Sequence, residues 1–108
     1  MQEAVIVATA RTPIGRAFKG SLVDARPDDM GAFVVNEVME RAPAVNRADV
    51  ADVILGCANQ AGEQGVNIAR NVALLANLPD TVPGTTVARQ CASSLQAARP
   101  SSGAGARW

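Results

Sequence analysis

The segment 53–58 reads VILGCA, and the segment 84–98 reads GTTVARQCASSLQAA. The first is a short, continuous apolar run, which is typical of a strand buried on both faces. The second opens with β-branched residues at 85–87, typical of a strand, and continues from Cys91 to Ala98 as a helix. Between them, apolar residues recur at helical spacing over 68–76. This order of strands and helices predicts an α/β layered domain with a mainly parallel sheet.

The flanking sequence extends the same pattern. The run AVIVAT at 4–9 predicts a further buried strand, followed by a Pro/Gly loop at 11–15. Asp28 and Asp29 are expected to cap a helix that ends before Pro43. The apolar face of that helix is predicted to consist of Met30, Phe33, Val34 and Val38. The second helix is expected to present Ile68, Ala69, Val72, Ala73, Leu75 and Ala76.

Composition narrows the class of protein. The 108 residues suit one small domain, and 21 alanines among the apolar residues predict a thin core. Ten basic and ten acidic side chains cancel, and aromatic residues make up 3%. A nucleic-acid partner would need clustered positive charge, so none is expected. The apolar runs are too short to span a membrane, and the N-terminus does not resemble a signal peptide, so a cytoplasmic location is expected.

Cys91 is the main candidate for chemistry. It falls where a β-branched strand passes into a helix, and free backbone N–H groups at such a position favour a thiolate. Small residues at 92–94 would let a substrate approach, as a covalent nucleophile requires. Position alone favours the alternative, a buried structural thiol. Cys57, beside Gly56, is predicted to be a structural core residue, and a disulfide with Cys91 is not expected.

Other polar groups carry weaker signals. The loop 59–65 contains two glycines, but it lacks a phosphate-binding motif and is interpreted as a turn that needs a positive φ. Arg11 and Arg70 can in principle meet a phosphate or carboxylate, although arginines that pin loops are commoner. The chain contains no histidine, which excludes a Cys/His dyad or a Ser/His/Asp triad within it. No bound metal is expected.

Four segments together resemble the thiolase family. The segment 87–97, VARQCASSLQA, is similar to the thiolase nucleophile segment. The segments 7–15 (VATARTPIG), 56–65 (GCANQAGEQG) and 67–70 (NIAR) resemble the family's opening strand and loop, the region after its second strand and the start of its next helix. Two positions depart from the pattern: Ala88 stands where the family usually has Asn or another small polar residue, and Ser94 replaces the commoner Gly.

The resemblance implies a function and a domain division. Residues 1–98 would be an incomplete N-terminal part of a thiolase-like αβα domain with a mixed, mostly parallel sheet. Residues 99–108 would be a disordered Gly/Ala/Ser/Pro/Arg tail outside the family. Thiolases are acyltransferases of fatty acid metabolism: a cysteine attacks a 3-ketoacyl-CoA, and coenzyme A then takes the acyl group. Cys91 would be that nucleophile, its backbone N–H contributing to the oxyanion hole. Coenzyme A thioesters would be substrates, with no bound cofactor.

Residues that the family supplies elsewhere are missing from this chain. The resemblance places a histidine in a G-H-P context and a second cysteine in a C-x-G context in the family's second half, and neither motif occurs here. The 108-residue chain is therefore predicted to be inactive alone. The resemblance implies homodimers or tetramers for the family, but that expectation does not extend to this 108-residue chain. The alternatives are a non-catalytic truncated fragment, one half of a split enzyme, or a related condensing enzyme of the ketoacyl-synthase type.

Overall fold

A computed structural model describes residues 4–99. Its helices are α1 (Pro27–Arg41), α2 (Ile68–Leu75) and α3 (Ser93–Ala98), and its strands are β1 (Val53–Gly56) and β2 (Gly84–Val87). Three 3-10 turns, η1 (Arg47–Asp49), η2 (Gly62–Gln64) and η3 (Gln90–Ala92), connect them. Apart from Arg99, the predicted tail 99–108 lies outside the described residues.

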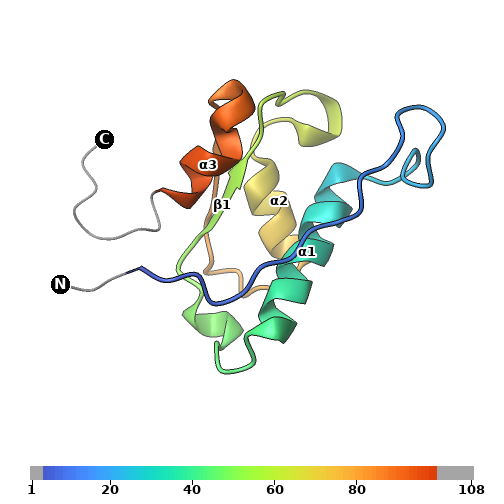
Figure 1. Ribbon diagram of the computed structural model, residues 1–108. Coiled ribbons are helices and arrows are strands. Elements are labelled where there is room, and N and C mark those ends of the chain that lie inside the picture. The colour runs from blue at the N-terminus through green and yellow to red at the C-terminus, as the bar shows by residue number, and fades with distance from the viewer. Residues whose placement is uncertain (1–3, 100–108) are drawn as a thin grey trace.

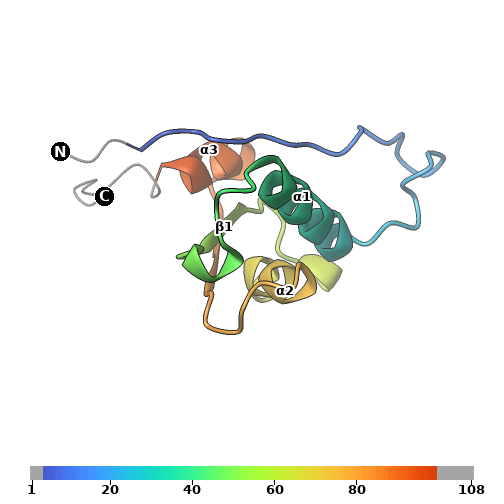
Figure 2. The same cartoon turned by 90° about the horizontal axis from the view of Figure 1, so that it is seen from below.

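The two strands form a parallel sheet with a helix on each face. Val53 pairs with Gly84 and Gly56 with Val87, so both strands run in register along their whole length. The Cys57 N–H donates to the Val87 carbonyl at 2.9 Å and continues the pairing past the end of β1. Figures 1 and 2 show α2 on one side of the strands and α3 on the other, with α1 packed beside α2. This arrangement confirms the predicted αβα layering.

The predicted strand at 4–9 is wrong. The described part of this segment has no strand pairing, and Val5, Ile6 and Val7 are 75%, 87% and 69% exposed. Its far end meets α1, where the Arg41 guanidinium donates to the Thr9 carbonyl at 2.6 Å, and the chain then continues extended past α1 (Figures 1 and 2). An apolar β-branched run favours an extended backbone, but a strand also needs a neighbour that exchanges hydrogen bonds with it.

Helix α1 begins at Pro27, before the cap predicted at Asp28 and Asp29. Pro27 occupies its first turn, where the missing N–H costs nothing, and Arg26 stands at the N-cap, where its side chain accepts no capping hydrogen bond from the helix backbone. Asp28 and Asp29 therefore lie in the first turn rather than at the cap, although their charge still suits the positive end of the helix. The helix ends at Arg41, before Pro43 as predicted.

The predicted apolar stripe of α1 is wrong at Phe33, which is 59% exposed, whereas Met30, Val34 and Val38 are half-buried. Ala32 is the buried apolar residue of this helix, and the half-buried Val35 packs against both core clusters. A Cβ built on Gly31 would lie 2.6 Å from a methyl group of Val72, so glycine lets α1 and α2 approach closely. On α2 the predicted face is confirmed except for Leu75, which is 46% exposed.

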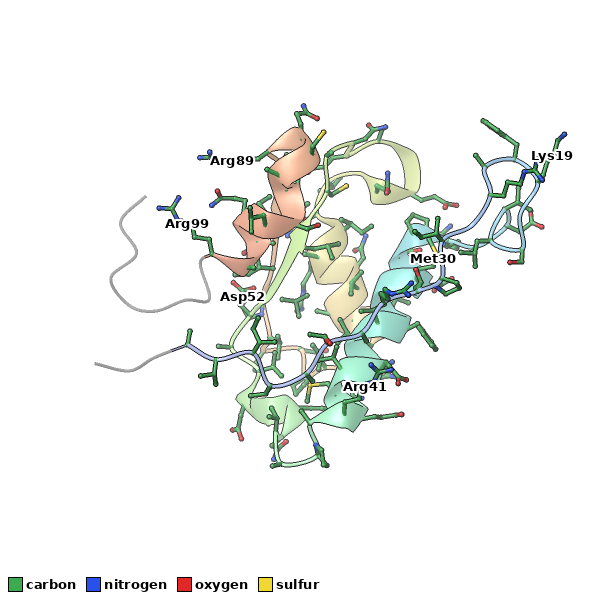
Figure 3. All side chains as sticks on the ribbon, viewed as in Figure 1. Lys19, Met30, Arg41, Asp52, Arg89 and Arg99 are labelled. Atoms are coloured by element: carbon green, nitrogen blue, oxygen red, sulfur yellow. The ribbon has the colours of Figure 1, made fainter. Side chains whose placement is uncertain are left out.

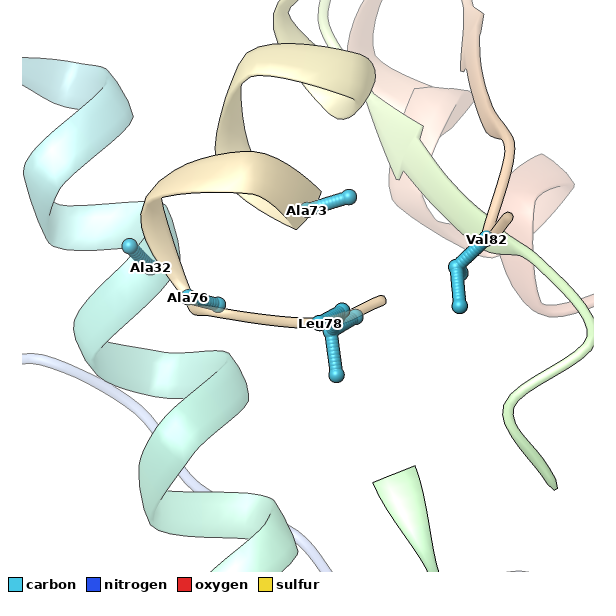
Figure 4. Packing of buried hydrophobic residues seen from close by; sticks show 5 residues of the cluster. All are labelled: Ala32, Ala73, Ala76, Leu78 and Val82. Carbon is cyan, nitrogen blue, oxygen red and sulfur yellow. The ribbon is translucent and has the colours of Figure 1, made fainter. Parts of the chain in front are cut away.

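The core is small and rich in alanine, as the composition predicts. One cluster joins α1, α2 and the segment before β2 (Figure 4), and it comprises Ala32, Ala73, Ala76, Leu78 and Val82. A second cluster comprises Cys57, Ile68 and Val72, and lies between α2 and the end of β1. Because alanine buries little apolar area, the first cluster depends on close approach between backbones.

A polar network joins α2 to β2. The Thr86 hydroxyl donates to the Asn67 side-chain oxygen at 2.7 Å and accepts the Ala69 N–H at 3.1 Å. The Asn67 amide donates to the Gly84 carbonyl at 2.8 Å. The Ala69 N–H is one of the unpaired donors of the first helical turn, so the network satisfies a group that the helix cannot. It also fixes β2, from which the segment carrying Cys91 departs.

Candidate active site

The candidate site is the sharp turn between β2 and α3. Strand β2 ends at Val87, η3 follows at Gln90–Ala92, and α3 begins at Ser93. Cys91 lies in η3 with its residue exposed and its thiol free. The sequence predicted a helix from Cys91, and the structure places one 3-10 turn before the α-helix.

The residue before Cys91 adopts an unusual backbone conformation. Gln90 has φ of +48°, in the left-handed region that residues other than glycine rarely enter. This geometry reverses the chain direction immediately after Arg89 and turns Cys91 to the surface. The positive φ of Gln90 was not predicted, because glutamine has no preference for the left-handed region.

Hydrogen bonds around Ser93 close the turn. The buried Ser93 hydroxyl donates to the Gln90 carbonyl at 2.7 Å and accepts the Arg89 N–H at 2.9 Å. The Ala92 N–H donates to the Arg89 carbonyl at 2.9 Å. This role of Ser93 was not predicted from the sequence, in which it is one of the small residues next to Cys91. Serine often bonds to backbone groups three or four residues earlier, and that tendency was the available signal.

Gly56 seats the turn on the sheet. A Cβ built on Gly56 would lie 2.4 Å from the Ser93 carbonyl carbon and from the Ser94 nitrogen. No side chain fits there, so α3 rests directly on the backbone of β1. The contact fixes the height of α3, and therefore of Cys91, above the sheet.

Cys57 has the structural role predicted for it. It is 8% exposed, packs with Ile68 and Val72, and its thiol donates to the Asn59 carbonyl at 3.4 Å. Both cysteines are free, as expected. They differ in accessibility, because Cys57 is buried and Cys91 is exposed. Only Cys91 is placed to meet a reagent or a substrate.

The other candidates from the sequence have structural roles or lie apart from Cys91. Arg70 donates to the carbonyls of Val82 and Asp80, which confirms that it pins the loop before β2. Gly62 has φ of +58°, as predicted for the loop 59–65. Arg11 is exposed beside the N-terminal segment. Arg89 projects outward beside α3 (Figure 3), where it lines a shallow groove.

An ion-pair cluster holds the loop 59–65 against α1. The Arg26 guanidinium donates to both carboxylate oxygens of Asp28, at 3.0 and 2.9 Å, and to Glu63 at 2.7 Å. These hydrogen bonds lower the pKa of the Asp28 carboxyl below its ordinary value, and Asp28 in turn raises the pKa of Arg26. Asp28 is a buried charge, and the bidentate contact is what makes its burial tolerable.

Within residues 4–99, no helix is long and apolar enough to cross a membrane. Over the same range, no three acidic, histidine or cysteine side chains are grouped so as to hold a metal ion.

The sequence and the fold match one family of known proteins. The family model for the thiolase N-terminal domain matches residues 4–103. The chain therefore belongs to the thiolase family. The crystal structure of the Bacillus anthracis acetyl-CoA acetyltransferase aligns with a TM-score of 0.80 and 41% sequence identity, covering 89% of this chain and 24% of that one.

Curated relatives point in the same direction. The chain is 54% identical over 96 residues to a 3-ketoacyl-CoA thiolase of Bacillus subtilis, which covers 89% of this chain. It is 55% identical over 97 residues to a beta-ketoadipyl-CoA thiolase of Acinetobacter baylyi, which covers 90% of this chain. These names favour a thiolase over the ketoacyl-synthase alternative. The chain spans 24% of the length of each of these two relatives.

Proposed function

We propose that this chain is the nucleophile-bearing part of an enzyme that transfers acyl groups between coenzyme A thioesters. The Cys91 thiolate attacks the ketone carbon of a 3-ketoacyl-CoA, and the bond between the carbonyl carbon and the α-carbon breaks. The α-carbon takes up a proton and leaves as acetyl-CoA, while the acyl group stays on Cys91 as a thioester. The thiol of a second coenzyme A then attacks that thioester, releases the acyl-CoA and restores Cys91.

One observation carries the proposal: Cys91 is exposed at a rigid turn at the carboxyl end of β2, whereas Cys57 is buried. Active-site groups in α/β folds commonly lie at the carboxyl ends of parallel strands. The backbone N–H of Cys91 is proposed to help stabilise the oxyanion of the tetrahedral intermediate. We also propose that coenzyme A thioesters act without a bound metal or prosthetic group.

The proton transfers need partners that this chain does not contain. It has no histidine, and attack by a cysteine is ordinarily assisted by a general base. We therefore propose that the 108-residue chain does not turn over substrate by itself. Activity would require the complementary part of a thiolase, and we propose that such assemblies work in the cytoplasm as dimers or tetramers.

A chimera tests this function. Residues 1–98 would replace the matching N-terminal quarter of the Bacillus subtilis 3-ketoacyl-CoA thiolase, to which the chain is 54% identical over 96 residues. Thiolysis of a 3-ketoacyl-CoA would be followed by release of acyl-CoA. We expect activity from the chimera, none from its Cys91→Ala variant, and none from the 108-residue chain.

The controls separate the two claims. A folded chimera that keeps its activity after Cys91→Ala would refute the role of Cys91. Turnover by the isolated chain above its own Cys91→Ala variant would refute the proposed inactivity. A Cys57→Ala chimera is the matched cysteine control, and we expect it to retain acyl transfer.

A further inference from the structure

The backbone before Cys91 is held in a conformation that its own sequence disfavours. Gln90 has φ of +48°, and an L-residue in this region places its Cβ close to a carbonyl oxygen. Such a conformation persists only where surrounding contacts impose it. The contacts at this turn therefore identify the residue that holds it.

The Ser93 hydroxyl is in the right place to impose this conformation. It bridges the two residues on either side of the reversal, donating to the Gln90 carbonyl at 2.7 Å and accepting the Arg89 N–H at 2.9 Å. Ser93 is 4% exposed, so water does not readily replace either bond. Because β1 lies directly against its backbone at Gly56, Ser93 is itself held in a fixed position.

We propose that Ser93 is a positioning residue for Cys91: its buried hydroxyl locks Gln90 in the left-handed turn that presents the thiol. The inference rests on the proposed function for its catalytic meaning, but its structural content concerns the turn alone. In this role Ser93 does not touch the substrate. It acts through the backbone that carries Cys91.

The neighbouring serine provides a matched control. Ser94 is exposed, and the same Ser→Ala change there removes a hydroxyl one residue away without removing either bond to the turn. Gln90→Gly provides the opposite test, because glycine adopts positive φ without steric cost. If Ser93 works by holding Gln90 in the left-handed region, a glycine at position 90 makes the hydroxyl less necessary.

The first experiment measures hydrogen exchange of the Ala92 amide in the 108-residue chain. This N–H donates to the Arg89 carbonyl, so it reports on the turn without being bonded to Ser93 itself. Ser93→Ala is expected to speed its exchange about tenfold, the effect of losing a buried hydrogen bond. Ser94→Ala should leave it unchanged, and Ser93→Ala should have a smaller effect in the Gln90→Gly background. Equal effects in both backgrounds would overturn the proposal.

The proposal can also be tested if the Ser93→Ala variant does not fold. Should Ser93→Ala unfold the chain, the double variant Ser93→Ala/Gln90→Gly is expected to recover the circular dichroism spectrum of the original chain. Failure of glycine to restore any folding would overturn the proposed coupling between Ser93 and Gln90.

The second experiment uses the chimera described above. Ser93→Ala is expected to lower kcat about tenfold or more while KM stays within about twofold, because the bound substrate is unchanged but the thiol is misplaced. A rise in KM alone would overturn the positioning role. If the chimera shows no Cys91-dependent activity, the proposed function fails, and the exchange data still decide whether Ser93 locks the turn.

Discussion

Replacing Gly56 with alanine should displace α3 and lower stability. A Cβ at this position would lie 2.4 Å from two backbone atoms of Ser93 and Ser94, whereas ordinary contacts begin at 3.4 Å. The two elements must therefore separate by about 1 Å. Since the opposing atoms are backbone, no side-chain rotation relieves the clash, and a cost in the upper part of the usual range for overpacking, about 2–3 kcal/mol, is expected.

A small gain offsets part of this cost. Gly56 does not have a left-handed φ, so alanine restricts the unfolded chain and recovers about 0.4–1 kcal/mol. The net loss is then about 2 kcal/mol. For a domain of this size, that lowers the Tm by about 8–16 °C. Thermal unfolding followed by far-ultraviolet circular dichroism measures the shift.

A second glycine separates steric clash from backbone strain. Gly62 has open space around its Cβ position but a φ of +58°. Gly62→Ala should cost about 1–2 kcal/mol through backbone strain, and Gly62→Asn less, because asparagine tolerates this region. At position 56 the cost should instead grow from alanine to valine. A Gly56→Ala chain whose Tm stays within about 2 °C of the original would refute the direct seating of α3 on β1.

Three further changes test contacts away from the turn. Thr86→Val removes the hydroxyl between Asn67 and α2 and should lower the free energy of unfolding in urea by about 1–3 kcal/mol, while Thr86→Ser should preserve most of it. Arg70→Ala should release the loop before β2, seen as faster limited proteolysis there than in Arg70→Lys. Because Arg26 lowers the pKa of Asp28 in the folded chain, the stability from this carboxylate is present at neutral pH and is lost as the pH falls below about 4. The free energy of unfolding, measured in urea at pH 7 and pH 3, should fall less between these pH values for Asp28→Asn than for the original chain.

The sequence predicted elements whose signals are local. The structure confirms the helices predicted at α1 and α2 and the strands predicted at β1 and β2. Their signals, apolar periodicity and helix-breaking residues such as Pro43, lie within the segment that forms each element. The N-terminal run 4–9 failed for the opposite reason. Its apolar β-branched residues favour extension, but pairing depends on what lies beside them in space.

The details of the site depended on long-range contacts. The motif around Cys91 predicted where a nucleophile would lie, and the structure exposes that residue. The left-handed Gln90 could not be predicted, because its conformation is imposed by Ser93 and by the β1 backbone. The inner face of α1 was only partly predicted: Phe33 is exposed, and the burial of Ala32 and the close approach at Gly31 depend on the packing of α2 against this helix.

Gly31, Gly56 and Gly84, at which a helix meets another helix or a strand, differ in how freely the sequence can change around them. At Gly56 and Gly84 the nearest atoms are main chain, which every amino acid shares, so no second substitution nearby can make room for a side chain. At Gly31 the nearest atom belongs to the Val72 side chain. A larger residue there can be accommodated by a smaller one at 72. A compensating substitution can therefore relieve the contact between the helices, but not the two contacts at the sheet. The surroundings of Cys91 thus belong to the part of this fold in which amino-acid substitutions are least tolerated.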